Sequence, residues 1–395
     1  MTPGDPGPGA GWAARSGNVA RRFEFVRPCV GEAKSMSIRI PTESRSEKVF
    51  PGAMKGHVET HRFPSRVLEG NPLHDPVERE LPVYLPPSGK SEGRPLLLLL
   101  TGYTGAGWVH FQKPRYIQDT IAGRLDRLIR TGAAAEAVMV APDCLTTLGG
   151  SQYLNSSATG RYEDYVMTEV LPWVRERYHT GPTAALGTSS GGYGSFVLAL
   201  RHPDEVRALG SNAGDAYFEY SYLPEFPVAF REIRKAGGPE ALLKRVLSEP
   251  VSGFGPKNAM IQGLEMMGYA SCYSPSESEP GRFDLPFDLE TGELRSDVWD
   301  RWLAWDPVRM IRTDRYRAAL RKLAYVYVDG GSRDEYSLDV GARIFATEAQ
   351  RQGVRADFEE FDGIHADGGP RYDVMIPRLL AALGFPAEKN RGASV

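Results

Sequence analysis

The residues Gly187-Thr188-Ser189-Ser190-Gly191-Gly192 form the pattern G-x-S-x-G, whose central serine can serve as a nucleophile. A short apolar run at 184–186 precedes the pattern and an amphipathic run at 193–200 follows it. The pattern therefore lies between a predicted strand and a predicted helix. At so sharp a turn the strand and the helix nearly collide, so the residues two before and two after the serine must be small. This context favours Ser189 as a nucleophile over a chance match in a Gly/Ser-rich loop.

Two backbone N–H groups are candidates for an oxyanion hole, which stabilises negative charge on a carbonyl oxygen. The Ser190 N–H starts the predicted helix and points toward the place where that charge would develop. The loop 102–108, which follows a predicted strand at 96–101, has three glycines that allow a close backbone approach. The Tyr103 N–H is the predicted second donor. The glycine spacing of this loop fits neither the P-loop nor the G-x-G-x-x-G pattern, so no nucleotide cofactor is expected.

A serine nucleophile needs a general base, and that base needs an acid to orient it. In enzymes with this strand–turn–helix nucleophile motif, the acid and the base both follow the nucleophile along the chain. His202 and His365 are the histidines that follow Ser189. His202 would lie at the far end of the predicted helix, about 20 Å away at ~1.5 Å per residue. His365, in a loop before the last predicted helix, is the predicted base.

Three carboxylates in the loop after the strand predicted at 323–328 compete for the role of the acid. Asp329 abuts the strand and is expected to brace the loop by accepting from backbone N–H groups, while Glu335 is expected to cap the following helix. Asp334 follows two glycines and can turn back toward His365, so it is the predicted acid. Asp329 and Glu335 stay open as alternatives.

Strands and helices alternate along most of the chain, which predicts an α/β fold with a mostly parallel sheet covered by helices on both faces. The predicted strands cover 58–67, 78–84, 96–101, 137–141, 206–212, 323–328 and 357–361, and the predicted helices cover 115–129, 162–178, 338–352 and 371–383.

The segment 216–308 interrupts this alternation, because it has no clear strand but many aromatic residues and prolines. It is too long and too apolar for a simple loop. It begins after a strand, at the edge where α/β sheets bind ligands. The sequence predicts a helical cap insertion here, with Tyr220 and Trp302 as candidate substrate-binding residues. The alternative is a packing elaboration with no role in binding.

The composition of the chain narrows the functional classes that remain. The chain has 395 residues, of which 41% are hydrophobic and 25% charged, and a net charge of -3, so no nucleic-acid partner is expected. Three cysteines are too few for a disulfide framework or a cysteine zinc site, and Cys144 is expected to be a buried small apolar residue. Asp362, His365 and Asp367 are interpreted as the base and as polar groups of the loop and not as metal ligands, so neither metal nor cofactor is expected. No apolar run approaches the ~20 residues of a membrane span.

The two ends of the chain differ from the rest. Residues 1–50 are expected to be a disordered tail without the apolar stretch of a secretory signal, which predicts a cytoplasmic protein. Either Met1 or Met36 could be the true start. The catalytic domain is predicted at 51–386 and a polar tail at 387–395.

The chain resembles the putative-esterase family of α/β hydrolases, which includes esterase D, enterochelin esterases and the antigen 85 mycolyltransferases. The resemblance runs from about residue 57 to 383. Its carriers are the segments 83–87, 102–103, 160–165, 187–194, 202–204 and 331–336 and His365. It implies an α/β-hydrolase fold with Ser189, Asp334 and His365 as a catalytic triad. One departure is Thr101-Gly102 at the strand end, where esterases often have His-Gly.

These observations predict a serine carboxylic-ester hydrolase that acts on a small-molecule ester through an acyl-enzyme. An acyltransferase with the same triad is one alternative, and a non-catalytic binding protein that kept the fold is another. The aromatic cap suggests an aromatic or partly apolar acyl group, while the resemblance to enterochelin esterases suggests siderophore esters.

Overall fold

The computed structural model describes residues 54–112, 119–249 and 258–387, all within a compact unit that spans residues 46–395. The tail predicted at 1–50, Met36 and nearly all of the C-terminal tail lie outside the described residues. The domain boundaries therefore remain predictions.

An eight-stranded sheet is the centre of the fold, with the strand order β1-β2-β4-β3-β7-β8-β9-β10. The strands are β1 (His57–Pro64), β2 (Glu78–Leu85), β3 (Leu96–Leu100), β4 (Val138–Val140), β7 (Thr183–Thr188), β8 (Val206–Asn212), β9 (Tyr325–Gly331) and β10 (Ala356–Phe361). Strand β2 is antiparallel to both of its neighbours, and all other neighbouring strands pair in parallel. A separate small ribbon joins β5 (Asn155–Ser156) to β6 (Gly160–Arg161).

The five leucines of β3 show why the sheet is covered on both sides. Successive side chains of a strand point to opposite faces, and here Leu96, Leu98 and Leu100 enter one core while Leu97 and Leu99 enter the other. A continuous apolar run of this kind is typical of a parallel sheet buried on both faces. The predicted mostly parallel sheet with helices on both faces is confirmed.

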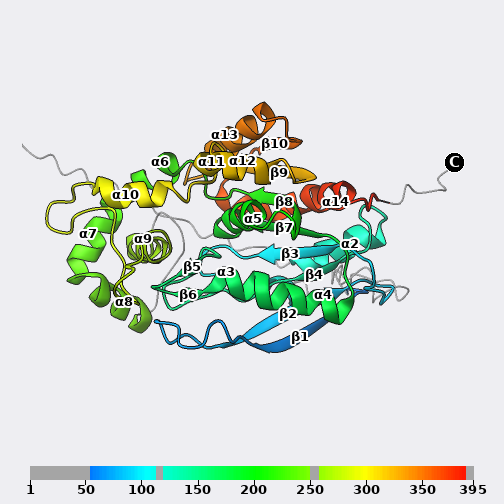
Figure 1. Ribbon diagram of the computed structural model, residues 1–395, viewed down its shortest axis with the longest axis horizontal. Coiled ribbons are helices and arrows are strands. Elements are labelled where there is room, and N and C mark those ends of the chain that lie inside the picture. Colours follow the sequence, from blue (N-terminus) through cyan, green and yellow to red (C-terminus); the bar gives the residue numbers. More distant parts are fainter. Residues whose placement is uncertain (1–53, 113–118, 250–257, 388–395) are drawn as a thin grey trace, which may run out of the picture. The chain divides into compact units, whose positions relative to one another are not determined.

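The helices divide between these two cores (Figure 1). Phe196, Val174 and Phe345 bring three helices to the first core, and Leu125 and Leu379 bring two to the second. The first three are α5 (Ser190–Arg201), α4 (Leu171–Tyr178) and α13 (Leu338–Arg351), and the second two are α2 (Ile121–Arg130) and α14 (Tyr372–Ala382).

Most predicted elements match in type, and three differ in detail. The helix predicted at 115–129 is described from Ile121, and residues 113–118 lie outside the description. The helix predicted at 162–178 consists of α3 (Tyr162–Asp164), the π-helical η2 (Tyr165–Val170) and α4. The run after Ser189 was predicted to be amphipathic, which is wrong. Every residue of α5 from Ser190 to Leu200 is buried, because α11 (Pro307–Met310) and α12 (Asp314–Leu320) pack on α5 opposite the sheet.

The segment 216–308 is helical where it is described. It contains α6 (Phe218–Ser221), η3 (Leu223–Glu225), α7 (Phe226–Ala236), α8 (Pro239–Ser248), α9 (Ala259–Tyr273), α10 (Ser296–Leu303) and the start of α11. Helices α7 to α10 lie together at one end of the sheet (Figure 1). We call these elements, from α6 to α10, the cap. Two further 3-10 helices, η1 (Gly107–Phe111) and η4 (His365–Arg371), follow β3 and β10.

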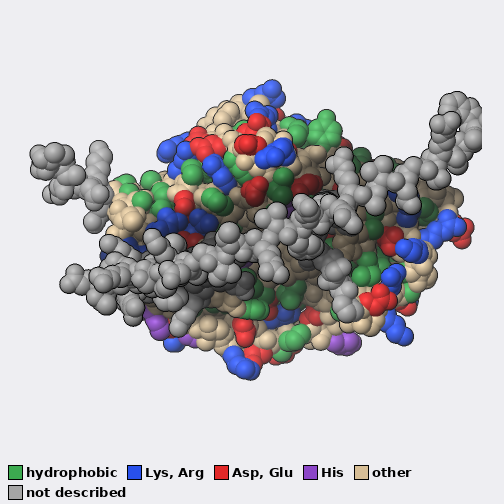
Figure 2. Space-filling view, turned by 180° about the vertical axis from the view of Figure 1, so that it is seen from behind, with side chains coloured by type: hydrophobic (Ala, Val, Ile, Leu, Met, Phe, Trp, Pro, Cys, Tyr) green, Lys and Arg blue, Asp and Glu red, His purple; other side chains and the backbone are tan. Residues whose placement is uncertain are grey.

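Positive and negative side chains are mixed on the visible surface of the described residues. On the face shown in Figure 2, basic and acidic side chains lie side by side over the part that the described residues form. Among the described helices, none has both the length and the apolarity required to cross a bilayer.

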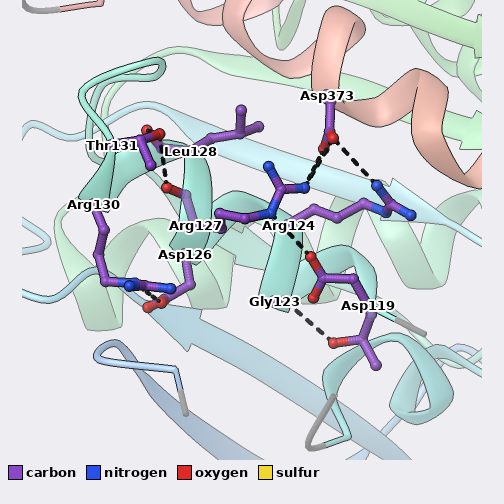
Figure 3. A network of polar contacts seen from close by, with 10 residues as sticks. Asp119, Gly123, Arg124, Asp126, Arg127, Leu128, Arg130, Thr131 and Asp373 are labelled. Carbon is purple, nitrogen blue, oxygen red and sulfur yellow. Dashed lines mark hydrogen bonds and ion pairs between the residues drawn. The ribbon is translucent and has the colours of Figure 1, made fainter. Parts of the chain in front are cut away.

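Carboxylates on two elements fasten helix α2 to its surroundings (Figure 3). Asp373 on α14 lies 2.8 Å from Arg127 Nη2 and 3.3 Å from Arg124 Nη1. Asp126 within α2 is 1% exposed and accepts hydrogen bonds from the Gly56 N–H at 2.6 Å and from the Tyr84 hydroxyl at 3.0 Å. The first carboxylate is partly open to solvent and the second is enclosed.

This difference in burial gives a prediction for stability. Asp126→Asn should lower the free energy of unfolding by about 1–3 kcal/mol, because the buried donors lose a charged acceptor. Asp373→Asn should cost less than about 1 kcal/mol, since solvent screens its ion pairs. Urea unfolding of both variants tests this order. A loss for Asp373→Asn equal to or larger than that for Asp126→Asn would contradict it.

Candidate active site

Ser189 occupies a strained turn between β7 and α5. Its backbone has φ 57° and ψ -130°, a combination that non-glycine residues adopt only when the surrounding structure enforces it. The Ser189 N–H donates to the carbonyl oxygen of Asn212 at the end of β8, and the Ser189 carbonyl accepts from the Tyr193 N–H. Two hydrogen bonds thus hold the turn from opposite sides.

The glycines around Ser189 are required by close backbone contacts. A Cβ atom at Gly191 would lie 2.1 Å from the carbonyl oxygen of Leu100 in β3, and one at Gly187 would lie 2.4 Å from the carbonyl carbon of Gly191. Both distances are far shorter than any real carbon contact. The predicted reason for small residues at these two positions is confirmed.

A cavity of about 210 Å³ opens beside Ser189. It is lined by residues that follow five parallel strands and by residues of the cap. The lining residues are Gly102, Tyr103, Ser189, Asp215, Ser221, Tyr222, Glu225, Glu265, Met266, Tyr269, Tyr336, Leu338 and His365. The cavity therefore lies at the carboxyl edge of the sheet, where α/β folds bind ligands, and it contains both Ser189 and His365.

His365 begins η4 and is fixed by the loop that follows β9. Its Nδ1 lies 2.8 Å from Asp334 Oδ2, and its backbone N–H donates to Glu335 Oε2 at 3.0 Å. The other Asp334 oxygen accepts from the Tyr336 N–H at 2.9 Å, and the Tyr336 ring packs against the imidazole with centroids 5.0 Å apart. The Asp334 side chain has no exposure, while that of His365 is 21% exposed.

The surroundings of His365 shift its proton affinity. Burial lowers the pKa of the imidazole, but the hydrogen bond and the charge of Asp334 outweigh burial and hold the pKa above its usual value of 6.5. The charges of Asp215 and Glu335 act in the same direction. With Nδ1 directed at Asp334, Nε2 is the nitrogen left for exchange of a proton with a ligand.

The two alternative acids have other partners. Asp329 accepts hydrogen bonds from side chains, among them Arg371 Nε at 2.8 Å and the Tyr327 hydroxyl at 2.9 Å. The expectation that it braces the loop through backbone N–H groups is thus wrong, because the buried end of β9 gives it donors from neighbouring side chains. Glu335 does not cap α13, whose N-cap is Ser337. Its carboxylate instead accepts from the His365 N–H.

The two predicted oxyanion donors both belong to backbone close to Ser189. Ser190 is the first residue of α5, and the first N–H groups of a helix have no partner within it. A Cβ on Gly102, the neighbour of Tyr103, would lie 3.4 Å from the Ser189 Cβ, so this loop runs directly beside the serine. Among the described residues, no acceptor is bonded to the Tyr103 N–H.

Thr101, which stands where esterases often have histidine, has a structural role. Its hydroxyl donates to the Gly105 carbonyl at 3.0 Å and so closes the loop after β3. The Tyr153 hydroxyl accepts from the Thr101 N–H and donates to the Thr101 carbonyl, at 2.6 and 2.8 Å. The strand end is therefore clamped before the chain reaches Gly102.

The two aromatic residues predicted to bind substrate do not reach the cavity, which corrects that prediction. Trp302 is completely buried and donates its indole N–H to Ser274 Oγ at 2.8 Å. Tyr220 is 49% exposed and packs on Tyr217. The aromatic side chains build the interior of the cap instead, where Trp302 lies between Tyr222 and other rings. Tyr222 and Tyr269 line the cavity in their place.

Three acidic residues of the cavity were not found by sequence reasoning. Asp215 follows β8, Glu225 ends η3 and Glu265 lies on α9. A signal for Asp215 was its position in the loop that follows the strand end at Asn212. A signal for Glu265 was a single acid in the otherwise uncharged helix 259–273.

The other residues considered from the sequence lie away from the cavity. His202 ends α5 and lies 2.7 Å from Glu163 Oε1. Cys144 is 4% exposed, and burial raises the pKa of its thiol, which agrees with an inert apolar residue. Within the described residues, no group of three or more potential metal ligands is present.

The comparisons with known proteins decide the family. Residues 76–372 match the model of the family described as "Putative esterase". The chain belongs to this family. It is an esterase, and its predicted family membership is confirmed. No curated protein sequence matches this chain.

Solved structures show the fold of this esterase. A ferulic acid esterase is 20% identical with a TM-score of 0.51, over 83% of this chain and 99% of that one. An S-formylglutathione hydrolase from Agrobacterium tumefaciens is 15% identical with a TM-score of 0.50, over 84% and 96%. With the family match and the sheet described above, these likenesses confirm the predicted α/β-hydrolase fold.

The contact at Gly191 generates a prediction for the turn of the esterase. Gly191→Ala should lower the free energy of unfolding by about 2–3 kcal/mol, because the new methyl group overlaps the backbone of β3. Gly369→Ala is the matched control, since a Cβ there meets nothing closer than 3.8 Å. Urea unfolding measures both. Equal midpoints for the two variants would show that the turn can relax without cost.

Proposed function

We propose that this esterase hydrolyses carboxylic esters through an acyl-enzyme, with Ser189 as nucleophile, His365 as general base and Asp334 as the acid that orients it. The observation that carries the proposal is the 2.8 Å contact between His365 Nδ1 and Asp334 Oδ2 at the wall of the cavity that Ser189 also lines. A buried carboxylate fixes the tautomer and stabilises the imidazolium once it forms.

The steps follow from these roles. Ser189 Oγ attacks the ester carbonyl carbon while its proton passes to His365 Nε2, and the carbonyl oxygen becomes negative. The N–H groups of Tyr103 and Ser190 stabilise that oxygen. His365 then gives the proton to the departing alcohol, which leaves an acyl group on Ser189. Water attacks this acyl group with His365 again as base, and the acid is released.

The strained turn supports this assignment. Positive φ at a non-glycine residue costs of order 1–3 kcal/mol and is concentrated at functional sites. Ser189 combines that strain with a place in the cavity, whereas Ser190 contributes a backbone N–H at the start of α5. The two adjacent serines therefore have separable roles.

A pair of alanine variants separates them. Ser189→Ala should lower kcat for an activated ester by about 10⁴- to 10⁶-fold and abolish labelling by a fluorophosphonate probe, because the nucleophile is lost. Ser190→Ala should keep most of the activity, since alanine retains the N–H. Circular dichroism checks that both variants fold. An active Ser189→Ala together with an inactive, folded Ser190→Ala would overturn the assignment.

The pKa of His365 predicts the pH dependence. The base must be neutral, so kcat/KM should rise with pH through one ionisation whose midpoint lies above 6.5, in the direction that Asp334 shifts it. Asp334→Asn should move this midpoint down, because burial alone lowers the pKa, and should reduce kcat by about 10⁴-fold. pH profiles with an activated ester measure both effects.

Asp329→Asn is the control for this experiment, since the Asp329 side chain is as completely buried as that of Asp334 but is bonded to other side chains. It should lower stability and leave the midpoint of the pH profile in place. An unchanged midpoint in Asp334→Asn with a displaced one in Asp329→Asn would transfer the role of the acid to Asp329.

A further inference from the structure

The cavity contains a carboxyl group that no described residue satisfies. Eight acidic residues are buried in the described part of the esterase, and Glu265 is 5% exposed. The other seven each accept a hydrogen bond, as Asp306 does from the Phe218 N–H at 3.0 Å and Asp215 from Gln152 Nε2 at 3.3 Å. No hydrogen bond or ion pair to Glu265 is present within the described residues. Its side chain lines the cavity instead.

A buried carboxyl group without a hydrogen-bond partner costs free energy, so the presence of Glu265 in this cavity requires an explanation. An unsatisfied buried polar group costs free energy, and the cost is larger if the group is charged. The neighbours on α9 are apolar or aromatic, and replacement of Glu265 by such a residue would remove the cost. A ligand that binds the carboxyl group would supply the missing partner.

The chemistry of the cavity indicates the charge of that partner. Glu265, Glu225 and Asp215 all line it, and none of the described lining residues is Lys or Arg. An anion would meet three carboxyl groups in a partly desolvated space, where like charges repel strongly. The tyrosine rings at positions 103, 222 and 269 add π faces, which attract cations.

We propose that the cavity selects esters that carry a cationic alkylammonium group, and that Glu265 is the residue that binds this cation. The proposal rests on the ester hydrolysis proposed above and assigns the substrate class of the same site. The ester carbonyl lies at Ser189, and the cation lies against α9, where Glu265 and Tyr269 share one face of the helix.

The protonation of Glu265 makes the selection depend on pH. Burial, together with the charges of Glu225 and Asp215, raises the pKa of Glu265 to about 8. Burial likewise raises the pKa of Asp215 to about 6. The free cavity therefore gains negative charge as pH rises from 6.5 to 8.5, and a bound cation favours the ionised carboxylate.

Other titratable groups also face this space. They are His365 from η4, Tyr336 from the loop after β9, Tyr103 from the loop after β3, and Tyr222 and Tyr269 from the cap. Of these, His365, whose pKa is held above its usual value by Asp334, loses positive charge as the pH rises, which also favours a cation. A substrate with a permanent charge makes the pH dependence a property of the protein alone.

The test compares cationic esters with neutral esters of the same shape. One pair, choline butanoate and 3,3-dimethylbutyl butanoate, places the charge on the alcohol side. The other pair places it on the acyl side, with 4-nitrophenyl esters of 4-(trimethylammonio)butanoate and of 5,5-dimethylhexanoate. For wild type, kcat/KM should favour the cationic member of at least one pair by about 10- to 100-fold at pH 8.5. The ratio should be smaller at pH 6.5.

Two variants assign the preference to one carboxyl group. Glu265→Gln should reduce the cationic-to-neutral ratio to within about threefold of one at pH 8.5. Glu277→Gln, which removes an exposed acid of the cap outside the cavity, should leave the ratio as in wild type. Glu265→Gln should unfold at a urea concentration no lower than wild type does, because it removes an unpartnered buried carboxyl group.

The outcomes separate this inference from the function on which it rests. Hydrolysis of the neutral esters without preference for the cationic ones in either pair would overturn the cation site and leave the esterase mechanism standing. A preference that survives in Glu265→Gln would also overturn it. Failure to hydrolyse any ester, with no fluorophosphonate labelling of Ser189, would overturn the proposed mechanism and this inference together.

Discussion

The backbone contact between Gly191 and the end of β3 is the constraint on which the site depends. With 2.1 Å between an imagined Cβ and the Leu100 carbonyl oxygen, helix α5 lies as close to the sheet as a chain can. That approach requires the sharp turn with positive φ at Ser189 and places Ser190 at the start of α5. The same contact thus fixes the serine and one of the two predicted oxyanion donors. The free energy for it comes from the two cores that bury the β3 leucines on either face.

The other groups of the site stand in loops that follow strand ends, and these strand ends set their positions relative to the turn at Ser189. The loops after β9 and β10 bring Asp334 and His365 together, and the backbone of His365 is held by Glu335. The carboxylate of Asp329, which lies within β9, is bonded to Arg371, Tyr327 and Asn212 instead of to the histidine. Asp329 and Asp334 therefore differ in their contacts because of the donors around them, and not because of their distance from the histidine along the chain.

The sequence was sufficient for those features whose cause is local. The strand 206–212 and the glycines at 187 and 191 were predicted because periodicity and steric demand can be read from neighbouring residues. The sequence was not sufficient where packing between residues far apart in the chain determines burial or a hydrogen-bond partner. The complete burial of α5 depends on α11 and α12, which lie far away in the sequence, and Glu335 accepts from the His365 N–H instead of from the start of α13. The aromatic residues 220 and 302 were assigned to the substrate because a sequence cannot tell a ring in a cap's interior from one at its cavity.

The division between the sheet and the cap has a consequence for the chemistry of this esterase. The groups assigned to bond breaking stand on strand ends and on the first turn of α5, which close packing holds in place. Glu225 and Glu265 stand on the cap, whose aromatic interior around Trp302 continues the first core through the contact of Tyr273 with Tyr193 of α5. Neither carboxylate is next to Gly191, so a change at either one can alter the charge of the cavity without disturbing the contact at Gly191. Asp215 is the exception, since it follows β8 and its charge also acts on His365. A cation bound near Asp215 would oppose that influence and lower the pKa of His365, which favours the neutral base. Substrate charge and base strength are coupled at this one residue.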